Sequence, residues 1–419
     1  MSAAAAGTEP TVQMLAPASG LLAVGRVLSM PETNDEPFSD VRRQTLARLS
    51  QSILADASLR ADPASVALAY WLRRSNVDRL HAAYERRMHA AGSGSLFVPV
   101  GRVFHVAPGN VDTVFVYSWA LAYLCGNQNI VRVSGNASEV LQRLLLHLAE
   151  LMQHDPALAS GNRFLTYEHD ASISEKISLW ATHRVLWGGD AAVSLLRSLP
   201  LQPYASERTF ATKFSYCVLS IGAVLDCDEA TLQKLANGFF NDVFWFDQMA
   251  CSSPQIVVWV GGAERLDAAS QCFRGALAAE IARRNHRGAP SNAMHRLNFA
   301  FDLACSRDLR AEIMQREFMS VRLPDTAEWT RIACGAGLFS EVRADDLSRV
   351  GAFAGDRDQT ITHFGFADAE VRELARSAGG RGVDRIVPVG EALAFDPVWD
   401  GYDLVADFLR QVTVRTGSR

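Results

Sequence analysis

Short apolar strands alternate with helices through the middle of this chain, and this alternation constrains its fold more than any other feature. Residues 98–110 (VPVGRVFHVAPGN) are predicted to form strand, turn, strand and turn, and the apolar residues 111–124 form a helix that ends at Gly126. The pattern continues with strands at 129–134, 164–167 and 184–187 and helices at 139–152, 174–180 and 191–199. It is typical of βαβ units and predicts a parallel sheet, which binds ligands beyond the carboxyl ends of its strands.

A second alternating series begins near Phe214. A strand at 216–221 is followed by a helix from Asp228, a polar turn, a strand at 255–260 and a helix over about 265–284. The chain beyond that helix has a less regular pattern. Because 419 residues exceed the size of one core and no low-complexity linker is visible, interleaved lobes are expected.

The N-terminal region is predicted to be a helical layer. Helices are expected after Ser39, which can cap the first, after the Asp62-Pro63 pair, and after Asn76. The Ala-rich start is either a disordered tail or a peripheral strand. It is not expected to be a signal peptide, because the first 25 residues contain no Lys or Arg.

The composition excludes several classes of function. A formal net charge of −5 and the lack of a basic arm argue against nucleic-acid binding. Seven cysteines are scattered without a CxxC pair, which indicates a reducing compartment and no disulfide framework or structural zinc site. No apolar run reaches transmembrane length, so a cytoplasmic location and no membrane segment are expected.

Cys251 is the candidate for a reactive cysteine. The motifs GxGxxG, GxxxxGK, HExxH and GxSxG are all absent. Cys251 lies in the polar stretch DQMACSSPQ (247–255), between an apolar-striped helix and a β-branched run. This setting favours a presented side chain, although a small buried cysteine is an equally good local reading.

Several segments together resemble the aldehyde dehydrogenase superfamily. The stretch at 98–134 resembles its run from G-x-V through P-x-N to V-x-K-P, WGGDAAV (187–193) resembles its Gly-Ser segment, and residues 239–260 resemble its nucleophile segment. The DQ-A-C-SSPQ form and the RIVPVG…WDG ending are most similar to the LuxC-type fatty acyl-CoA reductases of bacterial bioluminescence. The resemblance covers about residues 95–405.

This resemblance implies an α/β, aldehyde-dehydrogenase-like fold, with a parallel-sheet cofactor-binding lobe and an α/β catalytic lobe. The implied division is an N-terminal tail and helical layer at 1–95, an NADP-binding lobe at 96–213, a catalytic lobe at 214–400 and a C-terminal segment at 401–419. The last segment would pack back on the cofactor lobe or form an oligomer interface. The resemblance also implies a homo-oligomer, as is usual in the family.

The resemblance also implies a reaction. Cys251 would attack an acyl-CoA or acyl-carrier thioester, and hydride transfer from NADPH would reduce the acyl-cysteine to a fatty aldehyde. Asn110 falls at the P-x-N asparagine and would stabilise the oxyanion together with the backbone N–H of Cys251. By composition alone, Asn110 would be a turn residue. An acyl-protein synthetase or an acyltransferase is the kind of partner that the family suggests.

The expected cofactor-binding residues are Arg132, Ser134, Gly188 and Gly189. Arg132 stands where the superfamily has a cofactor-binding lysine, and Gly135 stands where NAD-preferring members often have a glutamate, which favours NADPH. The glycine pair would allow the backbone to approach a pyrophosphate. The alternatives are a strand arginine with its head in solvent and an ordinary strand-to-helix turn.

The sequence departs from hydrolytic aldehyde dehydrogenases at their E-L-G-G-K motif. Aligning Lys213 with the motif's lysine puts Thr209 at the position of the water-activating glutamate, which suits an acylating enzyme. A shifted register would make Glu207 the base and the protein an NAD(P)-dependent aldehyde oxidiser. Two further alternatives are a cysteine acyltransferase or thioesterase without redox chemistry, and a non-catalytic acyl-carrying subunit.

Three other features have structural interpretations. His105, in an apolar strand, is predicted to be a hydrogen-bonded core histidine rather than a general base. Gln248 either orients Cys251 or bonds the backbone of its own loop. The basic run from Arg283 to Arg287 could meet CoA phosphates, but a solvated helix end is the more usual reading.

Overall fold

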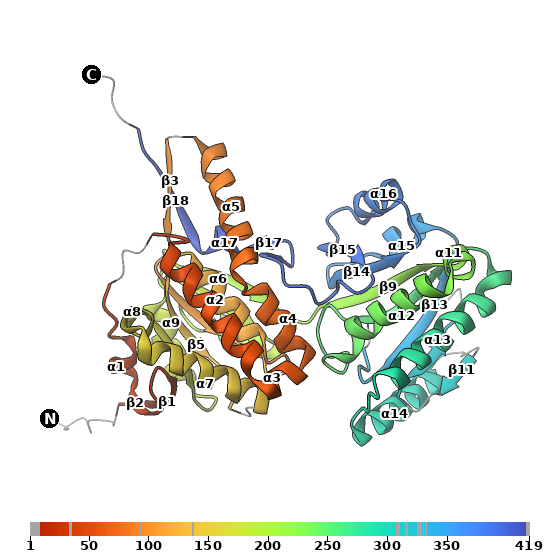
Figure 1. Cartoon of the computed structure of the whole chain (residues 1–419), viewed down its shortest axis with the longest axis horizontal. Helices are drawn as coiled ribbons and strands as arrows, with labels where there is room; N and C mark the ends of the chain where they lie inside the picture. Colours follow the sequence, from red (N-terminus) through yellow and green to blue (C-terminus); the bar gives the residue numbers. More distant parts are fainter. Residues whose placement is uncertain are drawn as a thin grey trace. The chain divides into compact units, whose positions relative to one another are not determined.

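The computed structural model describes residues 9–32, 36–92, 94–135, 138–306, 311–314, 317–324, 329, 331 and 333–415. The chain forms two compact units (Figure 1). The first unit comprises Met1–Ala211 and Phe395–Arg419, and the second comprises Thr212–Ala394. The N-terminal helices and the C-terminal segment therefore belong to the same unit as the first sheet.

The first unit contains a seven-stranded sheet, formed by β1 (Thr11–Ala16), β2 (Gly20–Ala23), β4 (Arg102–Val106), β5 (Gln128–Arg132), β6 (Asn162–Thr166), β7 (His183–Trp187) and β8 (Ser206–Phe210). The strand order is β2-β1-β6-β5-β4-β7-β8. The five strands from β6 to β8 in this order are parallel, which confirms the parallel sheet predicted from the alternating pattern. β1 is antiparallel to its neighbours β2 and β6, so residues 11–16 form the second strand from one edge of the sheet, while residues 1–8 lie outside the described part.

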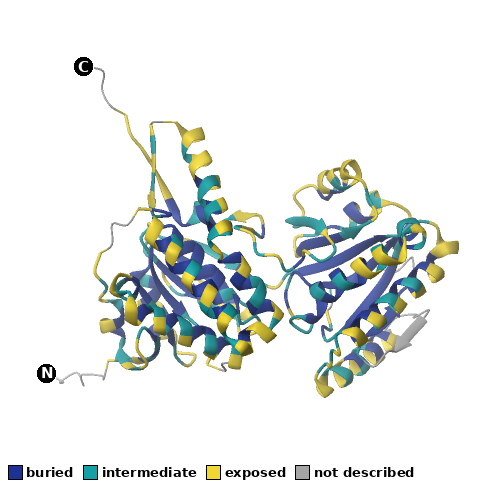
Figure 2. Cartoon of the chain, in the orientation of Figure 1, coloured by how far each residue is buried: buried dark blue, intermediate teal, exposed yellow. Residues whose placement is uncertain are grey.

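Helices cover both faces of this sheet, and its strands are therefore apolar on both sides. One face carries α2 (Asp40–Ala55), α4 (Pro63–Trp71), α6 (Val114–Leu124) and α7 (Glu139–His154), and the other carries α1 (Val24–Leu28) and α9 (Ala171–Trp180). Adjacent residues of β4 serve different cores, since Val103 packs on the first face and Phe104 on the second. Figure 2 shows the buried residues gathered on the strands and on the inward sides of the helices.

The predicted N-terminal helical layer is present, with two corrections. Asp62 caps α4 as expected, because its carboxylate accepts a hydrogen bond from the backbone N–H of Ser65 at 2.8 Å. Ser39 directly precedes α2, but its side chain makes no capping bond there. The third helix, α5 (Arg74–Ala91), begins at Arg74 rather than after Asn76.

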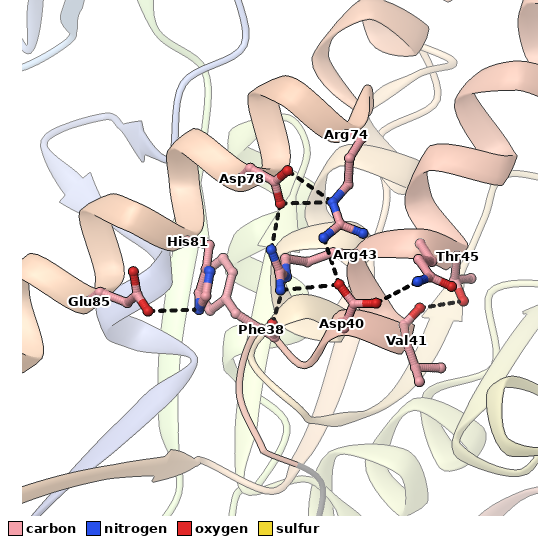
Figure 3. Close-up of polar contacts among 10 residues, drawn as sticks. Phe38, Asp40, Val41, Arg43, Thr45, Arg74, Asp78, His81 and Glu85 are labelled. Atoms are coloured by element: carbon pink, nitrogen blue, oxygen red, sulfur yellow. Dashed lines mark hydrogen bonds and ion pairs between the residues drawn. The ribbon is translucent and has the colours of Figure 1, made fainter.

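Ion pairs join α2 to α5 (Figure 3). Arg43 of α2 pairs with Asp78 of α5 at 2.5 Å, and Arg74 of α5 pairs with both Asp78 and Asp40. These carboxylates are more than a third exposed, so solvent screens the pairs and each contributes little to stability. The apolar side chains beneath the pairs, such as Leu46 and Leu49 of α2, supply most of the packing between the layers.

The C-terminal segment is part of the first unit. β18 (Leu409–Thr413) pairs antiparallel with β3 (Ser95–Pro99), and α17 (Leu404–Asp407) buries Leu404 in the core around α6. The remaining short elements of the first unit are α3 (Ala57–Ala61), α8 (Pro156–Gly161), α10 (Asp190–Arg197), β16 (Val398–Trp399) and β17 (Tyr402–Asp403), and the second unit contains the short helix η1 (Ala263–Arg265). Within the described residues, every helix is too short or too polar to cross a lipid bilayer.

The second unit is built on another seven-stranded sheet, formed by β9 (Phe214–Ser220), β10 (Pro254–Val260), β11 (Ala311–Met314), β12 (Met319–Arg322), β13 (Leu338–Ala344), β14 (Asp358–Phe364) and β15 (Arg385–Pro388). The strand order is β11-β12-β13-β10-β9-β14-β15, and only β11 pairs in the antiparallel sense. β10, which follows the Cys251 turn, is therefore the central strand.

Helices also cover both faces of the second sheet. They are α11 (Ile221–Asp226), α12 (Glu229–Phe244) and α13 (Leu266–Arg283) on one face, and α14 (Pro290–Ser306), α15 (Leu347–Phe353) and α16 (Asp368–Ala378) on the other. The helix predicted from Asp228 is confirmed, and Asp228 caps it by accepting the backbone N–H of Thr231 at 2.8 Å.

The end of the second unit is more regular than its sequence pattern suggested. β13, α15, β14, α16 and β15 continue the alternation of strands and helices. The pattern is obscured in β14, because Asp358, Gln359, Thr360 and Thr362 are polar and yet fully buried. A strand with polar residues on its buried positions does not have the apolar run by which buried strands are recognised.

Candidate active site

The first unit has a large cleft at the carboxyl ends of its parallel strands. Its volume is about 1430 Å³, and it is lined by residues that follow β4, β5, β6 and β7. The strand order reverses direction at β4, and an open parallel sheet binds its ligands at such a point. Four residues predicted to bind the cofactor line this cleft, namely Arg132, Ser134, Gly188 and Gly189.

Arg132 lies at the carboxyl end of β5, with its guanidinium carbon 4.6 Å from the ring centre of Tyr167. Its Nη2 donates to the backbone oxygen of Tyr167 at 3.3 Å. Its buried Nε has no hydrogen-bond partner among the residues that the structure describes. A buried N–H of a cation without an acceptor is costly, so this position fits an anionic group such as a phosphate oxygen.

Gly188 and Gly189 form the connection from β7 to α10. Gly189 is the residue before α10, and its carbonyl accepts the backbone N–H of Val193 at 3.0 Å. The amino end of this helix therefore opens on the cleft, where backbone N–H groups and the helix dipole favour an anion. The local geometry suits both the predicted approach to a pyrophosphate and the alternative strand-to-helix turn.

A buried polar network supports the floor of the cleft. Trp187, which lines the cleft, donates from Nε1 to the hydroxyl of Ser118 at 3.2 Å. The same hydroxyl lies 2.8 Å from Nδ1 of His105, and Nε2 of His105 lies 3.1 Å from Oδ1 of Asn129. Asn129 in turn donates to Oδ1 of Asn162 at 2.9 Å. The network thus crosses the sheet from β7 through β4 to β6.

The direction of this network can be deduced from Asn129. Its Oδ1 only accepts, so Nε2 of His105 carries the imidazole proton and donates to it. Nδ1 is then the acceptor and takes a hydrogen bond from the hydroxyl of Ser118, which itself accepts the indole N–H of Trp187. Burial lowers the pKa of His105 to about 3, so the ring is neutral near pH 7. The prediction that His105 is a hydrogen-bonded core histidine is confirmed.

In the second unit, Cys251 is partly exposed in the turn between α12 and β10. The turn contains two consecutive residues with positive φ, Asp247 at 48° and Gln248 at 63°. Non-glycine residues rarely adopt this conformation, so surrounding contacts have to hold it. The polar stretch at 247–255 thus forms a constrained turn rather than a flexible loop.

Two buried glutamines hold this turn. Gln248 donates from Nε2 to the backbone oxygens of Pro254 and Leu338, at 2.8 and 3.0 Å, and accepts the N–H of Gly337. Gln255 donates from Nε2 to the backbone oxygen of Gln248 at 2.8 Å. Of the two roles considered for Gln248, backbone bonding is therefore confirmed, with partners on β13 as well as in its own turn.

Two further residues contact Cys251 itself. Ser215 of β9 donates from its hydroxyl to the backbone oxygen of Cys251 at 2.7 Å. Gln359 of β14 has its Nε2 3.4 Å from Sγ of Cys251. Neither residue was predicted from the sequence. Gln359 could have been suspected only from its place in a strand, but that strand itself was not recognised.

A buried carboxyl lies close to the turn. Asp242 of α12 is fully buried, and its two oxygens accept the backbone N–H groups of Gly390 and Ala392. Burial raises the pKa of Asp242 to about 7, while these two hydrogen bonds act in the opposite direction. The backbone oxygen of Asp242 accepts the hydroxyl of Ser253 at 2.6 Å. Asp242 thus joins the end of α12 to the nucleophile turn and to the segment after β15.

Asn110 and the Glu207 region belong to the first unit. Asn110 is exposed in the bend after β4, next to Gly109, which lines the cleft. Glu207 lies on β8, where one oxygen accepts Nε of Arg184 at 2.6 Å and the other accepts Nε of Arg197 at 3.1 Å. Both carboxylate oxygens are therefore engaged by guanidinium groups.

The basic run at the end of α13 is largely paired. Arg283 and Arg284 both bond the carboxylate of Glu280 at 2.6 Å, and Arg287 lies 3.6 Å from Glu317. These contacts favour the reading of the run as a helix terminus over a role in binding CoA phosphates. Elsewhere in the described residues, no three His, Cys, Asp or Glu side chains gather closely enough to hold a metal ion.

A family model described as acyl-CoA reductase (LuxC) matches residues 74–294, which is just over half of the chain. The chain belongs to this family. It is similar to the long-chain acyl-protein thioester reductases of Photorhabdus luminescens, at 28% identity over 165 residues, and of Vibrio harveyi, at 27% over 166 residues. Each match covers 39% of this chain and about a third of the relative, 32% and 33% respectively.

Solved structures place this member of the LuxC family in the aldehyde dehydrogenase fold. An NAD-dependent aldehyde dehydrogenase from Sinorhizobium meliloti has a TM-score of 0.63 at 13% identity, covering 90% of this chain and 83% of that one. A 1-pyrroline-5-carboxylate dehydrogenase from Thermus with bound NAD has a TM-score of 0.61 at 14% identity, covering 93% and 83%. The family resemblance and the α/β, aldehyde-dehydrogenase-like fold expected from the motifs are both confirmed.

Replacing Ser118 by Ala is expected to lower the free energy of unfolding of the first unit by about 1–3 kcal/mol, because two buried groups would lose their partner. Denaturant unfolding followed by tryptophan fluorescence measures this change. Ser194→Ala, at an exposed position of α10, is the matched control and should change stability by less than about 0.5 kcal/mol. Equal effects of the two substitutions would contradict the network.

Proposed function

We propose that this protein reduces a fatty acyl thioester to the aldehyde, with NADPH as the reductant and an acyl-cysteine at Cys251 as the intermediate. The observation that carries the proposal is the partly exposed Cys251 in a turn fixed by buried amide groups, within a chain of the acyl-CoA reductase (LuxC) family. The relatives named as long-chain acyl-protein thioester reductases support a thioester substrate. We propose either acyl-CoA or an acyl-carrier thioester as the donor.

The residues of this chain would act in a defined order. The thiolate of Cys251 attacks the thioester carbon, and a new C–S bond forms while the bond to the leaving thiolate breaks. The leaving thiolate then takes a proton from solvent. The side-chain amide of Asn110 and the backbone N–H of Cys251 would donate to the oxyanion that develops on the carbonyl. When bound, a reduced nicotinamide supplies the hydride that converts the acyl group to the aldehyde.

The environment of Glu207 supports reduction over hydrolysis. Both oxygens of Glu207 accept guanidinium N–H groups, from Arg184 and Arg197, so the contacts of this carboxylate are those of a structural ion pair on β8. Thr209, which the motif alignment places at the position of the base, has a hydroxyl that is not basic near pH 7. An acyl-cysteine without a water-activating group beside it would persist until thiol exchange or hydride transfer.

The cleft of the first unit supports NADPH as the cofactor. Its residues fit a nucleotide with a phosphate on the ribose, because the buried Nε of Arg132 has no described partner and Gly135 beside it carries no carboxylate. Ser134 would add a hydroxyl donor, and Gly188 and Gly189 would let the pyrophosphate approach the backbone. We also propose a homo-oligomer and a partner that supplies acyl groups, such as an acyl-protein synthetase or an acyltransferase.

Removal of the nucleophile is the direct functional test. The wild-type protein is expected to oxidise NADPH when a long-chain acyl-CoA is added, and Cys251→Ala is expected to lose this activity by a factor of at least about 10³, because a covalent intermediate can no longer form. The absorbance of NADPH follows the reaction. Cys272→Ala, at a partly exposed cysteine of α13, is the control and should retain activity. Thiol release without NADPH oxidation would instead indicate a thioesterase or an acyltransferase.

Arg132→Ala is expected to raise the dissociation constant for NADPH about tenfold and to change that for NADH much less, because a single charge-assisted contact to the extra phosphate is lost. Binding is measured by the fluorescence of the reduced nucleotide, without acyl-CoA. Glu168→Gln, at an exposed carboxylate of the same cleft, is the matched control. If Arg132→Ala weakened the binding of NADPH and NADH equally, a contact to the extra phosphate would be contradicted. If only Glu168→Gln changed the ratio of the two dissociation constants, Glu168 rather than Arg132 would discriminate between the nucleotides.

A further inference from the structure

The structure brings the side chain of Gln359 to the sulfur of Cys251. We propose that its carboxamide donates an N–H to Sγ of Cys251 and stabilises the thiolate relative to the thiol. Gln359 would then be a further functional residue of the nucleophile site, contributed by β14. The inference rests on the proposed role of Cys251 and adds a group that sets its reactive form.

The contact has the geometry of a hydrogen bond to sulfur. Nε2 of Gln359 lies 3.4 Å from Sγ, and the side chain of Gln359 is fully buried while Cys251 is partly exposed. An N–H donor favours the ionised form of its acceptor, and it does so more strongly where water is excluded on the donor side. Because the thiolate rather than the thiol is the nucleophile, this contact would raise the reactive fraction of Cys251 near pH 7.

The strands are irregular where this contact forms. The register between β9 and β14 shifts between Asp358 and Ile361, and the register between β9 and β10 shifts between Pro254 and Ile256. Such register shifts change the direction in which side chains point, and β-bulges, one form of them, are frequent beside active sites. Between the two shifts, the hydroxyl of Ser215 accepts the backbone N–H of Thr360 at 3.1 Å and donates to the backbone oxygen of Cys251. β9 thus holds the backbone of Cys251 through Ser215, and β14 contacts its sulfur through Gln359.

The orientation of the Gln359 amide decides whether it stabilises the thiolate or the thiol of Cys251. With Nε2 towards the sulfur, Oε1 of Gln359 lies 3.4 Å from the hydroxyl of Thr360, which can donate to it. The opposite orientation would turn the carbonyl oxygen to the sulfur and would favour the thiol, because an oxygen accepts a proton and repels a thiolate. The direction of the change in reactivity therefore tests which atom faces Cys251.

The charged groups on the elements around Cys251 are the same in the wild-type protein and in a variant of Gln359. Asp358 of β14 is neutralised by Arg331 at 2.6 Å, and Asp242 of α12 accepts two backbone N–H groups. Arg296 of α14 donates to the backbone oxygen of Ala336 at 2.6 Å. Asp247 lies within the turn itself. All of these groups remain in a Gln359 variant. A change in the pH profile of Cys251 reactivity relative to wild type is therefore caused by loss of the Gln359 amide.

The test is the pH profile of alkylation of Cys251 in the full chain. Iodoacetamide is the probe, and peptide mass spectrometry is needed because the chain has seven cysteines. Gln359→Met, similar in length but without an N–H, is expected to move the midpoint of the profile upward by about one pH unit. Gln359→Glu, which places a carboxylate at the sulfur, is expected to move it further and serves as the second variant if the first does not fold.

Ser215→Ala is the matched control. It removes the hydrogen bonds to the backbone of Cys251 and of Thr360 but keeps the Gln359 amide that donates to Sγ, so it should change the alkylation rate on the plateau without moving the midpoint. An unchanged or lower midpoint in Gln359→Met would overturn the proposal. The assay uses neither acyl-CoA nor nucleotide, so a negative result here is distinct from a failure of the proposed reductase activity.

Discussion

The nucleophile turn depends on buried amide side chains that hold a strained backbone. Asp247 and Gln248 adopt positive φ, and the carboxamides of Gln248 and Gln255 bond the backbone on either side of them. An amide is suited to this task because it carries two donors and an acceptor and does not change charge with pH. A residue with a titrating side chain would make the shape of the turn depend on the ionisation of its neighbours. The turn therefore presents Cys251 in a fixed position at the start of the central strand β10.

The first unit leaves the carboxyl-terminal edge of its parallel sheet open as a cleft, where we propose that the nucleotide binds. Its strands are buried on both faces, so binding groups gather where the strands end. Arg132, Gly188 and Gly189 lie at this edge, and the Trp187–Ser118–His105 network fixes the side chains beneath it. The neutral imidazole places no charge under the cleft, so in the proposed complex the attraction for an anion would come from Arg132 and from the amino end of α10.

The sequence predicted the elements whose burial follows a simple pattern. Alternating apolar runs located β4 to β7 and β9 to β10, and family motifs located the cleft residues and Cys251. The prediction failed in β14, because its buried positions carry Asp358, Gln359, Thr360 and Thr362, which read as a loop. Partners on other elements hold this strand, since Arg331 pairs with Asp358 and the hydroxyl of Ser215 accepts the backbone N–H of Thr360. The contact from Gln359 to the sulfur of Cys251 joins residues 108 positions apart, so no local pattern could reveal it.

The central claim is that Cys251 carries the acyl group. Mass spectrometry of the full chain after incubation with short-, medium- and long-chain acyl-CoA, without any reduced nucleotide, tests it most directly. The account predicts one added acyl group, located on the peptide that contains Cys251 and removed when NADPH is supplied. An acyl group on another cysteine, or an unmodified chain whose Cys251 still reacts with iodoacetamide, would contradict it.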